Sequence, residues 1–242
     1  IIGQMKGFDD TRGTLFFHIA NILKEKKPKA FILENVKQLV GHANGDTLKV
    51  IIKTLKGLGY QYVQYAVLNA LDYGLPQKRE RVIIIGHRDP ILFSYPSPMR
   101  PFKPLSEILE KKVDKKHYAS EYIRKKRKEA HKSAYKLSIW HENKAGNICS
   151  YPYSCALRAG ASYNYLLVNG ERRLTPREMF RLQGFPDSYI ISNNDSQARK
   201  QAGNAVPVNL VKAVILKLLP YVATTLDMTN ILREYEVDYN GK

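Results

Sequence analysis

Short apolar runs alternate with amphipathic segments in the amino-terminal part of the sequence, and this alternation constrains the fold more than any other feature. Runs rich in valine and isoleucine, such as RVIIIGH, predict buried strands, whereas apolar residues that recur every three or four positions predict helices. We expect strands at residues 29–35, 60–70 and 81–87, and helices at residues 12–27 and 45–59. Helices that alternate with buried strands predict an α/β fold on a largely parallel, doubly wound sheet with both faces covered.

Polar residues stand at the ends of two of these expected strands. Glu34 and Asn35 end the run FILEN, and Arg79 and Arg81 flank Glu80 where the strand RVIIIGH begins. In sheets of this kind ligands bind beyond the carboxyl ends of the strands, so Glu34 and Asn35 stand where chemistry is expected. A helix cap and a charged sheet edge would explain the same residues without chemistry, and this pattern alone leaves both interpretations open.

The chain is strongly basic, with 39 Lys and Arg against 22 Asp and Glu and a formal charge of +17. Such an excess favours a polyanionic partner over a surface that is merely well solvated. The most basic segment, residues 111–136, interleaves its charges with aromatic residues, as surfaces that contact a nucleic-acid backbone do. We therefore expect a nucleic acid as the partner.

The remaining composition argues against several classes of protein. Cys149 and Cys155 are the only cysteines, so neither a disulfide framework nor a zinc site is indicated, and no metal site is expected. The apolar runs are too short to predict a membrane span, and the first residues do not resemble a secretory signal. We expect a cytoplasmic protein.

The second half of the chain differs in character from the first. A proline-rich stretch at residues 89–104 predicts a domain boundary. Residues 147–174 are β-like, with Asn169-Gly170 as a hairpin turn. The sequence TPRE at residues 175–178 is a capping-box pattern with proline at the first helical position, which predicts a short helix. A later helix is expected to break at residues 203–204 before an apolar helix resumes.

Six segments in order along the chain resemble the sequence blocks of the bacterial DNA cytosine-5 methyltransferases. They are KGFDDTRGTLFF, ENVKQL, LNALDYGLPQKRERVIIIG, VDKKHYASE, RRLTPREMFRLQGFPDSY and QAGNAVPVNL. The resemblance implies part of a class I S-adenosylmethionine-dependent methyltransferase sheet, with a smaller, mostly β target-recognition domain. It also implies methyl transfer from S-adenosylmethionine to carbon 5 of a cytosine flipped out of a specific duplex site, as in restriction-modification systems.

The resemblance divides the chain into four parts. Residues 1–92 correspond to the carboxyl-terminal part of the catalytic domain, 93–185 to the target-recognition domain, 186–202 to a hinge and 203–242 to a return to the catalytic domain. Residues 91–164 resemble the family least, because each member reads its own site there. An enzyme of this kind is expected in the cytoplasm, associated with the nucleoid.

By resemblance, Glu34 is the carboxylic acid at ring nitrogen 3 of the cytosine, and Arg81 is the arginine at its exocyclic oxygen. Asn35 would help to hold the loop that carries the nucleophilic cysteine, which adds to carbon 6 of the ring. Arg79 would support this site or contact phosphate. The contacts with S-adenosylmethionine are expected at Gly203, Asn204, Ala205 and Val206.

The resemblance also implies contacts with double-stranded DNA. Residues 7–13 match part of the family's mobile catalytic loop, in which Arg12 would contact the DNA backbone. Ile2 and Arg158 are candidates for filling the gap that the flipped base leaves. Base-edge contacts would come from residues 151–165. Further backbone contacts are expected from Arg124, Lys125, Lys126, Arg127 and Lys128.

Two sequence blocks of the family are missing from these residues. The Pro-Cys pair of the nucleophile is expected just before Ile1, and the Phe-x-Gly-x-Gly cofactor turn further upstream. Cys149 and Cys155 fall in the recognition region and cannot substitute, so we expect no methylation by this chain alone.

Three explanations stay open for the missing blocks. A preceding segment of a longer enzyme carries them, a second polypeptide completes a split methyltransferase, or the chain is a DNA-binding fragment without catalysis. An RNA cytosine methyltransferase is a further alternative, against which the long basic segment favours duplex DNA.

Overall fold

The computed structural model describes residues 15–99, 101–191 and 194–223 of the chain. They form two compact units, the first from the described residues of 1–68, 80–97 and 214–242, the second from those of 69–79 and 98–213. The domain limits expected from the family resemblance stay a prediction. The compact units follow three-dimensional contacts instead, and they group the loop 69–79 with the later part of the chain.

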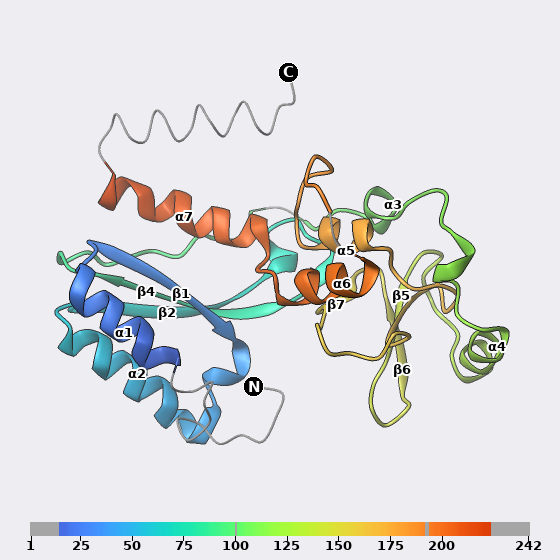
Figure 1. The fold of residues 1–242 in the computed structure, drawn as a ribbon, viewed down its shortest axis with the longest axis horizontal. Coiled ribbons are helices and arrows are strands. Elements are labelled where there is room, and N and C mark those ends of the chain that lie inside the picture. Colours follow the sequence, from blue (N-terminus) through green and yellow to red (C-terminus); the bar gives the residue numbers. More distant parts are fainter. Residues whose placement is uncertain (1–14, 100, 192–193, 224–242) are drawn as a thin grey trace. The chain divides into compact units, whose positions relative to one another are not determined.

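The helices and strands follow the predicted alternation through the first unit (Figure 1). The α-helices are α1 (Leu15–Lys26), α2 (Asp46–Gly57), α3 (Leu105–Ile108), α4 (Glu121–Ala130), α5 (Pro176–Leu182), α6 (Asp195–Asn204) and α7 (Val208–Val222). The strands are β1 (Ala30–Val36), β2 (Tyr62–Asn69), β3 (Gln77–Lys78), β4 (Glu80–His87), β5 (Ile139–Glu142), β6 (Ile148–Tyr151), β7 (Ser154–Cys155) and β8 (Leu166–Val168). The elements expected at 29–35, 45–59, 60–70 and 81–87 are confirmed, as is the described part of the first helix.

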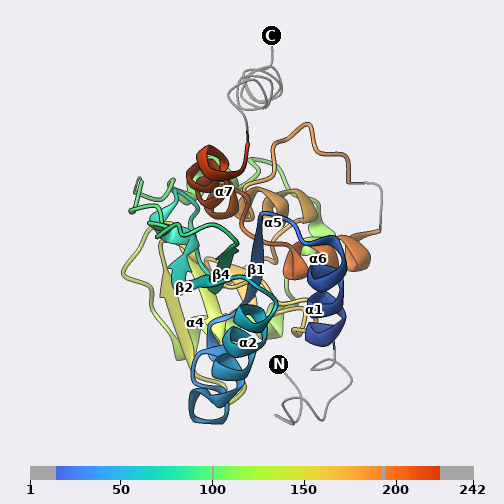
Figure 2. The same cartoon turned by 90° about the vertical axis from the view of Figure 1, so that its left-hand side faces the viewer.

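The sheet of the first unit has the strand order β1-β4-β2. Helices α1 and α2 lie side by side against this sheet (Figures 1 and 2). Their shared core contains Leu23 of α1, Leu55 of α2, Phe31 of β1 and Ile84 of β4. Full burial of such a side chain stabilises the fold by about 1.5–3 kcal/mol, so these apolar positions set which face each helix turns to the sheet.

Strands β1 and β4 run antiparallel, which corrects the expectation of a parallel arrangement for this pair. Their register sets Ala30 opposite His87 and Val36 opposite Arg81. The reason lies in the connection before β4: a parallel neighbour needs a long crossover, usually a helix, whereas only residues 70–79 join β2 to β4 and they contain no α-helix. So short a link lets the chain turn back, and β4 enters between β1 and β2 in the direction opposite to β1.

The second unit contains two small sheets. β5 pairs with β6 and β8 antiparallel, and β3 pairs with β7 in parallel. Ile139, Leu166, Phe180 and Leu182 lie in the core of this unit. Residues 93–185 do not form the mostly β domain that is expected, because helices α3, α4 and α5 lie among these short strands. The segment is a mixture of helix and strand.

The hairpin turn at Asn169 and Gly170 is confirmed. Both residues have positive φ values, 49° and 72°, and the Glu171 N–H donates to the Val168 carbonyl over 2.9 Å. This is the conformation that an Asn-Gly pair adopts most easily. Gly170 is also required for space, since an added Cβ would lie 2.8 Å from the ring of Trp140.

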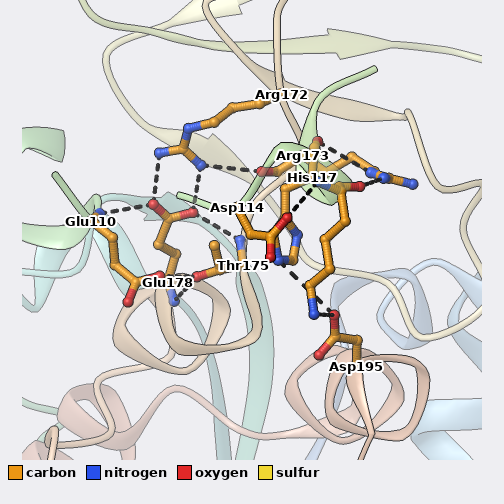
Figure 3. A network of polar contacts seen from close by, with 9 residues as sticks. Glu110, Asp114, His117, Arg172, Arg173, Thr175, Glu178 and Asp195 are labelled. Atoms are coloured by element: carbon orange, nitrogen blue, oxygen red, sulfur yellow. Dashed lines mark hydrogen bonds and ion pairs between the residues drawn. The ribbon is translucent and has the colours of Figure 1, made fainter. Parts of the chain in front are cut away.

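The capping box at the start of α5 is confirmed and belongs to a larger buried network (Figure 3). The hydroxyl of Thr175 accepts from the Glu178 N–H over 3.2 Å, and the Glu178 carboxylate accepts from the Thr175 N–H over 2.8 Å. The same carboxylate accepts two hydrogen bonds from Arg172, of 2.7 and 2.8 Å, and one from the Glu110 N–H. Because both oxygens of the buried Glu178 carboxylate accept hydrogen bonds, its charge is compensated and it stabilises the start of α5.

The break between two helices that is expected at Gly203 and Asn204 is confirmed, because α6 ends at Asn204. The chain becomes extended at Ala205, with φ −62° and ψ 151°, and α7 begins after Pro207. Among the described residues, 195–222 form one stretch whose length and apolar composition would allow a membrane span. The extended Ala205 interrupts that stretch, and Leu210 and Val214 are fully buried, as in the core helix of a globular unit.

Candidate functional site

Glu34 and Arg81 form an ion pair on one face of the first unit's sheet. Val36 lies opposite Arg81 and Ile83 opposite Glu34, so the two charged residues are diagonal neighbours and their side chains share a face. Arg81 Nε lies 2.7 Å from Glu34 Oε1, with 12% of the arginine side chain and 28% of the glutamate side chain exposed. The arginine is therefore mostly enclosed, while part of the glutamate stays accessible.

The surroundings keep this arginine oriented. Arg81 Nη1 donates to the Glu80 carbonyl over 2.8 Å. Burial lowers the pKa of Arg81, and the charge of Glu34 opposes that shift. A guanidinium group stays positively charged in proteins, so Arg81 can act as a cation here. Glu80, between the two arginines, forms an ion pair with Lys37 of 2.7 Å instead.

Asn35 does not join this pair. Its Oδ1 accepts the Val36 N–H over 2.8 Å, as expected for a local turn-like contact. Since successive side chains of a strand alternate in direction, Asn35 belongs to the opposite face of the sheet from Glu34. The structure thus brings together Glu34 and Arg81 but not Asn35.

Arg79 holds backbone segments together in the second unit. Its side chain is buried, with the residue 2% exposed. Nη1 donates to the Leu157 carbonyl over 2.8 Å, and Nη2 donates to the carbonyls of Gly203 (3.1 Å) and Ala205 (2.8 Å). Of the two roles expected for Arg79, this geometry favours support of the site over contact with phosphate.

Two glutamines that are not among the expected site residues complete this arrangement. Gln77 donates to the Leu182 carbonyl over 2.9 Å and accepts from the Leu157 N–H over 3.0 Å. Gln183 donates to the Ala202 carbonyl over 2.5 Å, and both glutamines are fully buried. Gln77 stands two residues before Arg79, and this spacing, which sets two side chains on one side of an extended segment, is the signal that could have identified the first of them.

The four expected cofactor residues differ in accessibility. Gly203 is buried, and an added Cβ would lie 2.4 Å from the backbone nitrogen of Ala159, so glycine is required there for close packing of two backbones. Asn204 and Val206 are exposed at the end of α6, and Ala205 is half-buried. Of this set, Asn204 and Val206 present side chains that a ligand can reach.

The basic helix α4 divides into exposed and internally paired cations. Arg127 is 2% exposed, and it pairs with Glu142 over 2.5 Å and donates to the Asn164 carbonyl. This corrects the expectation of a backbone contact for Arg127, because its charge is already used inside the fold. Lys125 and Lys126 are exposed, and no ion pair involves either of them within the described part of the chain.

Glu171 neutralises two further cations of this segment. Lys128 pairs with one of its carboxylate oxygens, and Arg124 lies 3.4 Å from the other. The hydrogen bond from Lys128 is the main reason why the pKa of Glu171 is lowered. Lys125 and Lys126 are therefore the members of the basic cluster best placed to meet an outside anion.

The remaining candidate positions lie in different settings. The guanidinium of Arg158 lies over the ring of Tyr165, 4.8 Å from the centroid. The backbone N–H of Arg158 donates to the Tyr165 hydroxyl. Ile2 and Arg12 lie outside the described residues. Cys149 and Cys155 are free thiols, and burial raises the pKa of Cys155 to about 11, so this thiol stays protonated near neutral pH.

Comparison with known families and proteins identifies relatives of this chain. The family model for C-5 cytosine-specific DNA methylase matches residues 1–219. The type II methyltransferase M.NgoBI of Neisseria gonorrhoeae is 56% identical over 216 residues, which are 88% of this chain and 68% of that protein. The type II methyltransferase M.HaeII of Haemophilus aegyptius is 54% identical over 217 residues, again 88% of this chain and 68% of that protein.

Solved structures show a similar fold. The Entamoeba histolytica methyltransferase EhMeth has a TM-score of 0.67 and 16% identity, covering 91% of this chain and 72% of that structure. The Dnmt2 methyltransferase of S. pombe has a TM-score of 0.65 and 21% identity, covering 91% of this chain and 75% of that structure. Since the family model spans most of the sequence and both bacterial relatives share more than half of the aligned residues, this chain belongs to the C-5 cytosine-specific DNA methylase family.

Proposed function

We propose that this chain supplies the base-binding and DNA-recognition parts of a restriction-modification DNA (cytosine-5-)-methyltransferase. Its fold would be part of a class I S-adenosylmethionine-dependent methyltransferase sheet. The observation that carries the proposal is the partly exposed Glu34–Arg81 pair, with 2.7 Å between the charged groups. The family and the two type II relatives support it.

The pair matches the chemistry of a cytosine edge. Nitrogen 3 and the exocyclic oxygen of cytosine are neighbouring hydrogen-bond acceptors. Glu34 would hold a proton at nitrogen 3, and Arg81 would donate to the oxygen, so that negative charge developing on the ring during attack at carbon 6 is stabilised. Arg81, which also donates to the Glu80 carbonyl, is oriented before any base arrives, and this saves reorganisation during the reaction.

S-adenosylmethionine would supply the methyl group, and the residues present fit only part of its site. Asn204 and Val206 expose side chains that can contact it, whereas Gly203 packs against backbone. Arg79 would act as a positioning residue, because it holds the carbonyls on both sides of Asn204. Double-stranded DNA would meet the exposed Lys125 and Lys126 of α4.

The nucleophile would come from a polypeptide segment outside these residues, so the chain alone would not transfer methyl. Cys155 is held protonated by its surroundings, and Cys149 Sγ donates to the His141 carbonyl over 3.7 Å. The first unit also offers a surface for such a segment: Leu15, Ile19 and Ile22 expose one apolar face of α1. Within the described residues β1 lies at the edge of its sheet, where a further strand can pair.

Transfer of labelled methyl from S-adenosylmethionine to mixed-sequence duplex DNA tests the proposal. We expect no incorporation by residues 1–242 alone, and incorporation at cytosine carbon 5 once the amino-terminal segment of the M.NgoBI relative is added. Incorporation by the chain alone would refute the assignment of the nucleophile to another segment. DNA binding without incorporation in the mixture would favour a non-catalytic DNA-binding fragment.

A further inference from the structure

A small basic hollow in the second unit uses none of the residues assigned above to the base, the cofactor or the DNA. Its volume is about 130 Å³, and Leu174 and Pro176 form part of its wall. The polar lining comes from four separate segments of the chain. These residues are Lys116, His117, Tyr163, Arg173, Asp195 and Arg199.

Two arginines converge on one aromatic ring in this hollow. The guanidinium carbon of Arg199 lies 4.0 Å from the centroid of the Tyr163 ring, and that of Arg173 lies 5.7 Å from it. Arg173 also donates to the carbonyls of Lys116 and His117, which fixes its direction. Arg199 Nη2 is 3.5 Å from the Ser162 carbonyl. Both guanidinium groups are thus held in place before a ligand binds.

The charges of the hollow do not cancel. Lys116 Nζ lies 3.1 Å from Asp195 Oδ2, so these two residues compensate each other. Within the described residues, no carboxylate forms an ion pair with Arg173 or Arg199. Burial lowers the pKa of His117 and so disfavours a third positive charge on its imidazole. Two positive charges therefore remain for an external anion.

The shape and the chemistry favour phosphate over a nucleic-acid base. A base that stacked on Tyr163 would have to compete with Arg199 at 4.0 Å and Arg173 at 5.7 Å from the ring centroid. Guanidinium groups, by contrast, fit phosphate oxygens through paired N–H donors, and a tyrosine hydroxyl can add another donor. The carboxylate of Asp195 would repel a phosphate only weakly, because Lys116 forms an ion pair with it and compensates its charge.

We propose that this hollow binds one phosphodiester group of duplex DNA through Arg173 and Arg199. The inference rests on the proposed function, since it takes duplex DNA as the substrate, and it adds a backbone contact on α6 to the exposed lysines of α4. A single phosphate contact would fix the register of the second unit on the duplex without reading sequence.

The salt dependence of duplex binding by the full chain tests this inference. Each phosphate contact contributes about 0.9 to the slope of log affinity against log salt concentration. We expect Arg199→Ala to lower that slope by about this amount and Arg199→Lys, which keeps the charge, to restore most of it. The double variant Lys53→Gln/Lys56→Gln, which removes two exposed charges of α2, is the matched control and should keep the slope of the parent chain.

Three outcomes separate the possibilities. A parental slope in Arg199→Ala would overturn the inference while leaving the proposed function intact. Thermal stabilisation by inorganic phosphate that Arg199→Ala loses, at constant ionic strength and with an unchanged DNA slope, would show a site for free phosphate and would also overturn it. The expected slope change in a complemented enzyme that never methylates DNA would support the pocket and refute the proposed function.

Discussion

Two Arg–Glu pairs of the same closest distance, one in each unit, differ in how completely they are enclosed. Glu34 and Arg81 meet at 2.7 Å with 28% and 12% of their side chains exposed. Glu178 and Arg172 also meet at 2.7 Å, but with 0% and 10% exposed, and the carboxylate accepts further bonds from two backbone N–H groups. A buried pair whose carboxylate already accepts several hydrogen bonds has no accessible group for a ligand, so its role is structural. A partly exposed pair keeps accessible donors and acceptors that a ligand can meet.

The largest expected effect comes from Glu34→Gln in a complemented enzyme. The variant cannot deliver a proton to ring nitrogen 3, so methyl transfer should fall by about 10²–10⁴-fold. Duplex affinity and stability should change little, because the glutamine keeps the size of the side chain at a half-open position. Single-turnover rates and duplex affinity, measured on the same samples, check both points. A loss of affinity with an unchanged rate constant would remove Glu34 from the chemistry.

The matching change in the enclosed pair is Glu178→Gln. It leaves the Arg172 guanidinium buried without its carboxylate, which should destabilise the second unit by about 3–5 kcal/mol. Urea unfolding followed by the fluorescence of Trp140, the only tryptophan, reports on this unit directly. Should Glu34→Gln destabilise as much as Glu178→Gln, the distinction between a ligand-binding pair and a structural pair would fail.

A smaller effect is expected from Thr175→Ala in the same buried network. The variant removes the cap of α5 and the hydroxyl that donates to Glu110 over 2.5 Å, while the bonds between Arg172 and Glu178 remain. Loss of a cap costs about 1 kcal/mol. The same unfolding measurement should place Thr175→Ala between the parent chain and Glu178→Gln. A loss as large as that of Glu178→Gln would mean that the cap, rather than the buried ion pair, holds this helix start.

The smallest effect is expected at an exposed Arg–carboxylate pair. Arg181 and Asp187 form two hydrogen bonds of 2.7 and 2.8 Å, but the aspartate side chain is 64% exposed. Asp187→Asn should therefore cost less than about 1 kcal/mol. The hydrogen bond from Arg181 lowers the pKa of Asp187, so this contribution is present above the unfolded-state pKa and is lost as the pH falls through the folded-state pKa. Unfolding curves of parent and variant should differ at pH 7 and converge in acid.

Positions 79 and 81 show where the sequence pattern stops being informative. Both arginines fit the same strand-start pattern, and resemblance alone ranked Arg81 above Arg79. In the structure Arg79 binds three backbone carbonyls of the second unit, from residues far along the chain, and Arg81 pairs with Glu34 in the first. Neither partner set could be read from local spacing. Arg127 is a similar case, since Glu142 and Asn164 enclose a charge that the sequence presents as part of a basic surface.

The sequence by itself determined the elements whose cause is local. Periodic apolar residues placed α2, β-branched runs placed β1 and β4, Thr175 with Glu178 started α5, and Asn169-Gly170 made its turn. Each of these depends on neighbouring residues, whose propensities and hydrogen bonds act over one turn of chain. The resemblance to the family predicted Glu34 and Arg81 as members of one site, and the two do form an ion pair.

Only the tertiary structure decided which segments meet. The antiparallel pairing of β1 with β4, the contact of Gly203 with Ala159 and the enclosure of Arg79 all join residues that are distant along the chain. Such contacts form because buried polar groups need partners and interiors must be filled without gaps. Those requirements apply to the folded chain as a whole, so no local pattern of residues expresses them.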